Sequence, residues 1–379
     1  MALSLRLPFI DNLRWVMIML VVSMHAAVTY SHLGSWYFME DTPVSKPEAF
    51  VFGTYQAWLQ SFFMGFLFFI AGYFVPKAYD TKGPGRFLRD RALRLGVPLL
   101  LYVFLLQPVA VYCIYLFDSP GDRIDLLTLY SHYIARGRWI SGTGPLWFCE
   151  ALLIFCAVYA LLRVAIPAIR ARVFPAPGKK AIAGFIALIA VSSFGIRLVW
   201  PNGTDLYNLQ LCYFSQYVFF FIAGIFAYRG NWLQKWSAAT GRYWGRAALI
   251  GGMVLWIGLL VFGGALKGDL TAYKGGFHWQ SFGECCREQL AGVGLSLFFL
   301  LWFRERFNSQ GRLARFFSAN AFAVYVFHAP ILIALSKMMV WLHLPLLLKF
   351  LLLTLLSIGV TYLLSALIFR RLPLLKNIL

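Results

Sequence analysis

The alternation of long apolar stretches and short charged segments constrains this chain most. Roughly ten stretches of about twenty mostly apolar residues follow one another, and each is long enough to cross a bilayer as a helix. Lipid cannot hydrogen-bond open backbone groups, so such segments fold as packed helices. We therefore predict an all-α, polytopic membrane protein of about ten transmembrane helices, forming a single membrane-embedded domain over residues 1–379. The expected spans are about 10–31, 51–75, 96–117, 145–167, 181–201, 207–228, 244–265, 285–303, 319–341 and 346–369.

The distribution of charge along the chain predicts its orientation. The chain is 60% hydrophobic and 13% charged, with a formal net charge of +19. Lys and Arg gather in every second connecting segment and in the C-terminal tail, whereas most acids lie in the other segments, so both termini are expected in the cytoplasm. This bias explains the high positive charge. We therefore expect the protein to interact with the lipid bilayer and not with nucleic acid. The basic segments are 77–94, 163–180, 229–246, 304–315 and 370–376.

The six cysteines give no sign of a metal site. Most of them fall inside apolar stretches, and their spacing fits neither a zinc site nor a disulfide framework. We expect them to act as small buried apolar side chains, and we expect no metal to be bound.

The first expected span carries two ionisable side chains on one face. Arg14 and His25 are eleven residues apart, so on a helix they lie about three turns and about 16 Å apart. Ionisable groups at the bilayer centre cost about 2.5–3.5 kcal/mol, which favours a functional interpretation. A guanidinium suits phosphate and an imidazole suits proton transfer. Asp11, one turn before Arg14, either orients it for an anionic ligand or forms a self-neutralising topological anchor with it.

Two further ionisable residues lie inside expected spans. Glu150 lies about one turn below the outer end of the fourth span, at the depth expected of His25, where a carboxylate assists an imidazole base. His328 lies near the middle of the ninth span, just before Pro330, which is expected to kink the helix. Each has a structural alternative: a backbone hydrogen bond for His25, a buried ion pair for Glu150 and simple packing for His328.

The second connecting segment predicts a short amphipathic helix over residues 85–98. Its apolar side chains can rest on lipid while its arginines face water. The segment is either a lipid-surface helix or an arginine cluster, including Arg91 and Arg94, that holds a phosphorylated donor. Elsewhere, Arg197, Arg287 and Glu288 lie near span ends, where we expect them to extend to the interface.

Several short motifs across the chain resemble the acyltransferase-3 family of integral membrane acyltransferases. They occur in the family's order over nearly the whole chain, although Ala71 stands where the family usually has serine. The motifs are Asp11, Leu13, Arg14 and His25 in the first span; Phe68–Tyr73 in the second; Arg91 and Arg94 in the following segment; Pro145–Glu150 in the fourth span; and Tyr325, His328 and Pro330 in the ninth.

The resemblance implies transfer of an acyl group from cytoplasmic acyl-CoA to a hydroxyl of an extracytoplasmic carbohydrate, in a bacterial inner membrane. Acyl-CoA would be a donor substrate, with no tightly bound cofactor. The ending at residues 370–376 and the ten-span layout favour succinyl transfer to a periplasmic glucan, with acetyl transfer left open. The Arg14–His25 spacing is close to that between the pyrophosphate and the thiol end of extended coenzyme A.

The expected roles of the residues follow from this chemistry. His25, assisted by Glu150, is expected to remove the proton from the acceptor hydroxyl, either for direct attack on the thioester or after transient acylation of His25 itself. The residues expected to bind the donor or substrate are Asp11, Arg14, Arg91, Arg94 and His328.

Two other classes of function are alternatives to acyl transfer. Intramembrane Arg, His and Glu also occur in secondary transporters and flippases for sugars or lipid-linked sugars. Such carriers often contain inverted repeats, and the sequence has no visible internal repeat. A scaffold for a glycan synthase is disfavoured because it does not need Arg14 and His25 on one helix face.

Overall fold

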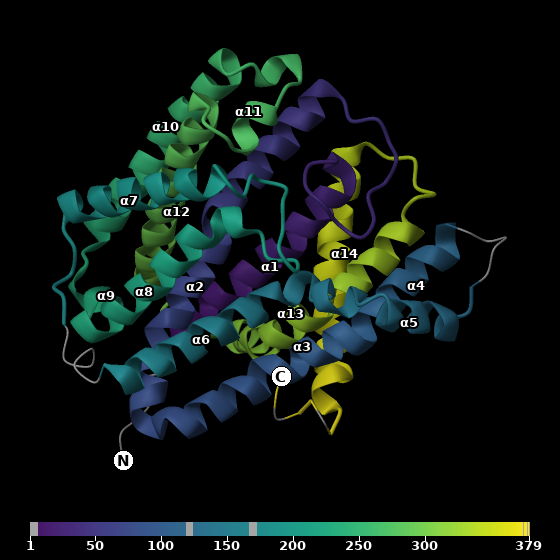
Figure 1. Cartoon of the computed structure of the whole chain (residues 1–379), viewed down its shortest axis with the longest axis horizontal. Helices are drawn as coiled ribbons and strands as arrows, with labels where there is room; N and C mark the ends of the chain where they lie inside the picture. Colours follow the sequence, from purple (N-terminus) through teal and green to yellow (C-terminus); the bar gives the residue numbers. More distant parts are fainter. Residues whose placement is uncertain (1–6, 119–123, 167–172, 374, 377, 379) are drawn as a thin grey trace. The chain divides into compact units, whose positions relative to one another are not determined.

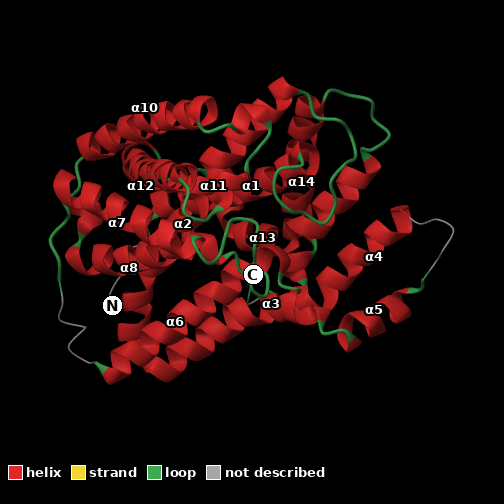
Figure 2. Cartoon of the chain, turned by 45° about the horizontal axis from the view of Figure 1, so that its top comes forward, coloured by secondary structure: helices red, strands yellow, loops and turns green. Residues whose placement is uncertain are grey.

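The described part of the chain is almost entirely helical. The computed structural model describes residues 7–118, 124–166, 173–373, 375–376 and 378. The protein is 80% helical, and its described residues form no strand (Figure 2). The predicted all-α class is therefore confirmed.

Fourteen α-helices are described, and some are single turns. They are α1 (Pro8–Ser31), α2 (Lys46–Arg91), α3 (Val97–Leu101), α4 (Gln107–Asp118), α5 (Leu126–Ala135), α6 (Trp147–Ala165), α7 (Lys179–Arg197), α8 (Phe214–Gly230), α9 (Trp232–Lys235), α10 (Ala238–Phe262), α11 (Thr271–Lys274), α12 (Trp279–Arg306), α13 (Arg312–Met338) and α14 (Leu346–Leu367).

Nine helical runs among the described residues are long and apolar enough to cross a membrane. One of them, Lys46–Tyr115, contains 70 residues and includes both the second and the third predicted span. Gly83 interrupts its first part with a φ of 73°, a conformation that costs glycine little. The segment predicted to be amphipathic continues beyond that kink as helix, in part as a π-helical turn at Ala92–Gly96. The predicted multi-pass membrane protein is confirmed.

The chain forms two compact units, and several long helices contribute to both. Unit 1 comprises residues up to Arg14, Ala57–Leu88 and Phe155–Gly311. Unit 2 comprises Trp15–Gln56, Arg89–Ile154 and the residues from Arg312 onward. Within unit 1, α12 packs along both α10 and α7, and within unit 2, α13 packs along α14 and α4 (Figure 1).

Paired glycines bring α2 and α8 together in unit 1. A Cβ atom on Gly72 would lie 2.1 Å from the backbone oxygen of Phe221, and one on Gly224 would lie 2.1 Å from that of Phe69. The two backbones therefore meet with no room for a side chain, as small-residue packing in membranes allows.

Candidate functional site

Three rings from separate segments meet in unit 2 around His25. The His25 ring stacks on the indole of Trp36, with centroids 3.9 Å apart and planes 18° apart. It also stacks on the ring of His328, with centroids 5.4 Å apart. His25 remains partly exposed, whereas His328 is fully buried. Helix α1 supplies the first histidine and α13 the second, so the structure brings these two predicted residues together.

The backbone of α13 fixes the tautomer of His328. Its Nδ1 lies 2.7 Å from the carbonyl oxygen of Tyr325, which can only accept, so Nδ1 carries the proton. Nε2 then presents a lone pair, and it is buried with no hydrogen-bond partner among the described residues. The hydroxyl of Tyr325 donates in turn to the backbone oxygen of Pro145. His328 is therefore an oriented acceptor in a dry part of the unit.

Trp36 belongs to the loop between α1 and α2, residues 32–45, which is part of unit 2. The next residue, Tyr37, donates its hydroxyl hydrogen to Gln107 and lies 3.1 Å from the hydroxyl of Tyr102. Because Tyr37 has one hydrogen, Tyr102 is the donor in that second bond. Burial raises the pKa of Tyr37 to about 12, so the phenol is protonated at neutral pH.

A buried ion pair anchors the same loop further along. The Glu40 carboxylate accepts a hydrogen bond of 2.6 Å from the Lys349 ammonium, and both side chains are buried. The backbone N–H of Glu40 also donates to the carbonyl of Thr29 in α1. Beside it, the ammonium of Lys337 lies 3.7 Å from the centre of the Phe38 ring. Contacts of the residues that follow Trp36 thus hold the loop in the position where its indole stacks on His25.

Glu150 stands near this cluster without contacting His25. It lies in the first turn of α6 and takes a hydrogen bond from Thr143. Its Oε2 is buried with no partner among the described residues, and no hydrogen bond in that part of the chain joins it to His25. The neighbouring Gly144 abuts Tyr37, because a Cβ atom there would fall 2.4 Å from the Tyr37 hydroxyl. Glu150 is thus linked to the α1–α2 loop through Thr143, which bonds to it, and Gly144, which contacts Tyr37.

The predicted donor-binding arginines are accessible. In unit 1, Arg14 pairs with Asp11 at 3.8 Å and lies over the Phe74 ring, with 44% of its side chain exposed. In unit 2, Arg91 ends α2, and Arg94 is exposed on the π-helical turn that follows. The predicted pairing of Asp11 with Arg14 is confirmed, whereas the donor-binding role of these residues stays a prediction.

The expectation that Arg197, Arg287 and Glu288 extend to the interface is wrong. All three are at most 3% exposed. Arg197 donates to Glu288 at 2.6 Å, and Arg287 donates to Glu284 at 2.5 Å. Charges buried in a membrane-spanning unit need such partners. Arg197 of α7 pairs with Glu288 of α12, whereas Arg287 pairs with Glu284 one turn away on α12 itself.

Sequence reasoning also missed Trp36, Tyr37 and Glu40. A signal was present, because three consecutive aromatic residues, 36–38, and an acid follow closely in a loop expected to be polar. Among the described residues, no group of three or more His, Cys, Asp or Glu side chains lies close enough to hold a metal ion.

The fold and the ring cluster define a class: a multi-pass helical membrane protein with a stacked imidazole on a membrane-spanning helix. The chain matches the family model described as an acyltransferase domain, of the acyltransferase-3 type, over residues 7–369. The protein belongs to the acyltransferase-3 family, which confirms the resemblance inferred from its motifs. No curated protein and no solved structure gave a significant match.

Proposed function

We propose that this acyltransferase moves an acyl group from cytoplasmic acyl-CoA to a hydroxyl of an extracytoplasmic glycan, with His25 as the base. The observation that carries the proposal is the imidazole of His25, held between the rings of His328 of α13 and Trp36 of the α1–α2 loop. An imidazole oriented by neighbouring rings can accept a proton without reorganising, which is what general-base catalysis requires.

One base is sufficient for this reaction, because the proton taken from the acceptor hydroxyl is returned to the leaving group. His25 takes the proton of the acceptor hydroxyl while its oxygen attacks the thioester carbonyl carbon. The C–S bond then breaks, and the coenzyme A sulfur leaves with the proton held by His25. In the two-step alternative, a ring nitrogen of His25 attacks the thioester carbonyl carbon, the C–S bond breaks, and coenzyme A leaves as the thiol with the proton of the other ring nitrogen. The acceptor hydroxyl then attacks the acyl-imidazole, and its proton returns to His25 as the N–acyl bond breaks. An acyl-enzyme burst in a rapid-quench experiment favours the second route.

Three unpartnered polar atoms support a hydroxyl-rich acceptor. Glu150 Oε2 and His328 Nε2 are acceptors, and Trp36 Nε1 is a donor; all three atoms are buried and lack a partner among the described residues. Buried polar groups usually have partners, so such atoms favour a ligand that both donates and accepts. A sugar hydroxyl does both, and we assign Glu150 and His328 to its orientation.

The α1–α2 loop is proposed to control entry of the acceptor. The distribution of charge assigns this loop to the outer side of the membrane. Since Trp36 covers His25, a glycan arriving from that side displaces the indole or slides beside it. On the donor side, Arg14 of unit 1 is proposed as one phosphate-binding residue for coenzyme A, and Arg91 and Arg94 of unit 2 are proposed separately for the same role, because a guanidinium matches phosphate geometry.

The acyl group and acceptor are proposed because the ending at residues 370–376 and the compact ten-span layout resemble glucan biosynthesis protein C, a membrane succinyltransferase that acts on periplasmic glucans. A succinyl group on a periplasmic glucan is the favoured product, in a bacterial inner membrane. The test uses proteoliposomes with acyl-CoA on the cytoplasmic face and glucan oligosaccharides on the other. Mass spectrometry should record succinylated oligosaccharide that forms only when both the protein and succinyl-CoA are present.

Other products of the same experiment are equally decisive. Acetylated product from acetyl-CoA would correct the acyl group and leave the reaction class in place. Sugar movement across the bilayer that is independent of acyl-CoA would favour a transporter and contradict the proposed function.

A further inference from the structure

Unit 1 contains a large apolar cavity that the proposed reaction does not use. Its volume is about 350 Å³, and α2, α7, α8 and α12 contribute its walls. Most lining residues are aromatic or aliphatic, with Phe66 and Leu300 among the buried ones. The one hydroxyl in the lining belongs to Ser296, and it has no hydrogen-bond partner among the described residues. A space with this lining suits a hydrocarbon chain.

The cavity opens sideways between helices. Ala181 on α7 and Ile222 on α8 line it and are exposed. On a membrane-spanning unit, exposed apolar side chains of α7 and α8 face the hydrocarbon of the bilayer. A chain from a neighbouring lipid can therefore enter without crossing water.

Two tryptophans close the end that the charge distribution assigns to the cytoplasm. Trp232 donates its Nε1–H to the backbone oxygen of Phe174 at 2.8 Å. Trp236 donates to that of Pro177 at 3.1 Å. Arg304 adds a further hydrogen bond to the backbone oxygen of Trp236. Tryptophans at this depth typically mark the boundary between hydrocarbon and headgroups.

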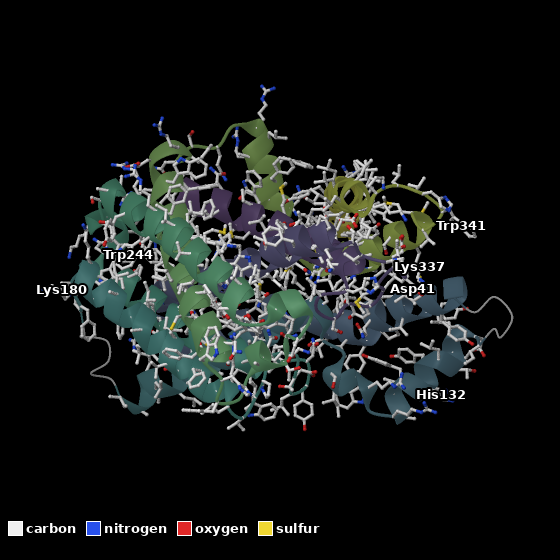
Figure 3. All side chains as sticks on the ribbon, turned by 90° about the horizontal axis from the view of Figure 1, so that it is seen from above. Asp41, His132, Lys180, Trp244, Lys337 and Trp341 are labelled. Carbon is white, nitrogen blue, oxygen red and sulfur yellow. The ribbon has the colours of Figure 1, made fainter. Side chains whose placement is uncertain are left out.

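Three exposed lysines stand beside that boundary. Lys179 and Lys180 begin α7, between two residues that line the cavity, and Lys235 directly precedes Trp236. Figure 3 shows the labelled Lys180 on the outside of unit 1. None of the three has an ion-pair partner in the described part of the chain. The sequence also contains no acid from 151 to 204 or from 206 to 268. The positive end of the α7 dipole adds to their field.

We propose that this cavity binds an acyl chain of an anionic phospholipid from the cytoplasmic leaflet. The lysines at the start of α7 hold its phosphate, and the tryptophans mark the level of its glycerol. The occupant is anionic because unneutralised lysines border the entrance, and it is a lipid because the opening faces hydrocarbon. This site lies in unit 1, apart from the ring cluster of unit 2, and it stands whether or not the proposed acyl transfer is correct.

The test measures lipid that stays bound. The protein is equilibrated in phosphatidylcholine vesicles that contain phosphatidylglycerol, extracted into detergent and analysed by native mass spectrometry. The wild type should retain phosphatidylglycerol. Ala223→Phe fills the cavity from α8 and should remove the adduct, whereas Ala187→Phe, on an exposed part of α7 outside the lining, should keep it.

A second pair of variants tests the headgroup without altering the cavity. Lys179→Gln/Lys180→Gln should lower the preference for phosphatidylglycerol over phosphatidylcholine about 10- to 30-fold. Lys77→Gln/Lys82→Gln removes the same charge from α2 and should leave the preference unchanged. This pair keeps the proposal testable if Ala223→Phe does not fold.

Three results would overturn the proposal. One is an unchanged adduct in both Ala223→Phe and the α7 lysine variant. Another is equal occupancy by soluble glycerophosphoglycerol, which would show a phosphate site with no need for a chain. The third is displacement of the lipid by acyl-CoA, which would assign the cavity to the donor.

Discussion

The ring of Trp36 lies parallel to the ring of His25, with their centroids 3.9 Å apart. An indole from a loop thus contacts an imidazole from a membrane-spanning helix. The contact restricts the orientation of the imidazole and excludes water from the covered face. It also makes the loop part of the site, although no motif of the family pointed to it.

Trp36→Ala should uncouple donor use from acyl transfer. Without the indole, water reaches the site, so hydrolysis of acyl-CoA should rise relative to transfer to the glycan. Trp36→Phe keeps a stacking ring and should retain most of the wild-type ratio. The ratio is measured by quantifying free coenzyme A and acylated glycan together. An unchanged ratio in Trp36→Ala would remove the loop from the mechanism.

Breaking the Glu40–Lys349 pair should destabilise unit 2. Glu40→Gln leaves a buried ammonium without its counter-charge, and breaking a buried pair typically costs about 3–5 kcal/mol. Glu40→Gln/Lys349→Met removes both charges and should recover much of that loss. Thermal unfolding in detergent gives the comparison. If the apparent Tm of the double variant is no higher than that of Glu40→Gln, the pair does not anchor the loop.

Arg14→Ala should weaken donor binding with little change in the chemical step. Losing one charge-assisted phosphate contact removes about 1.5–3 kcal/mol, which corresponds to a rise in the KM for acyl-CoA of roughly 10- to 100-fold. The kcat should stay within a few-fold. Steady-state kinetics in proteoliposomes separate the two constants. A fall in kcat at unchanged KM would place Arg14 in catalysis or folding instead.

Gly72→Ala should destabilise unit 1, because the new methyl group overlaps the backbone of α8. Forcing extra volume into a packed contact costs about 1–3 kcal/mol. Gly184→Ala is the matched control, since nothing lies within 4 Å of its Cβ position and a glycine-to-alanine change inside a helix gains about 0.5–1 kcal/mol. The apparent Tm should fall for Gly72→Ala and should stay the same or rise for Gly184→Ala. Equal effects would show that α2 and α8 separate easily.

The sequence predicts the helices better than it predicts the contacts between them. Hydrophobic length alone located the spans, and the motifs selected His25 and His328, which the structure brings together. The burial of Arg197 depends on Glu288 of another helix, 91 residues away, so proximity to a span end was misleading. The position of Trp36 depends on how a loop folds back, which no local periodicity encodes.

The rate of acyl transfer by His25→Ala tests whether His25 is the catalytic base. His132→Ala is the matched control, because that histidine is exposed on α5 (Figure 3). With both proteins inserted and folded to the same extent, we expect His25→Ala to lose about 10²- to 10⁴-fold in rate. His132→Ala should match the wild type. Transfer by His25→Ala at the wild-type rate would show that His25 is not the base.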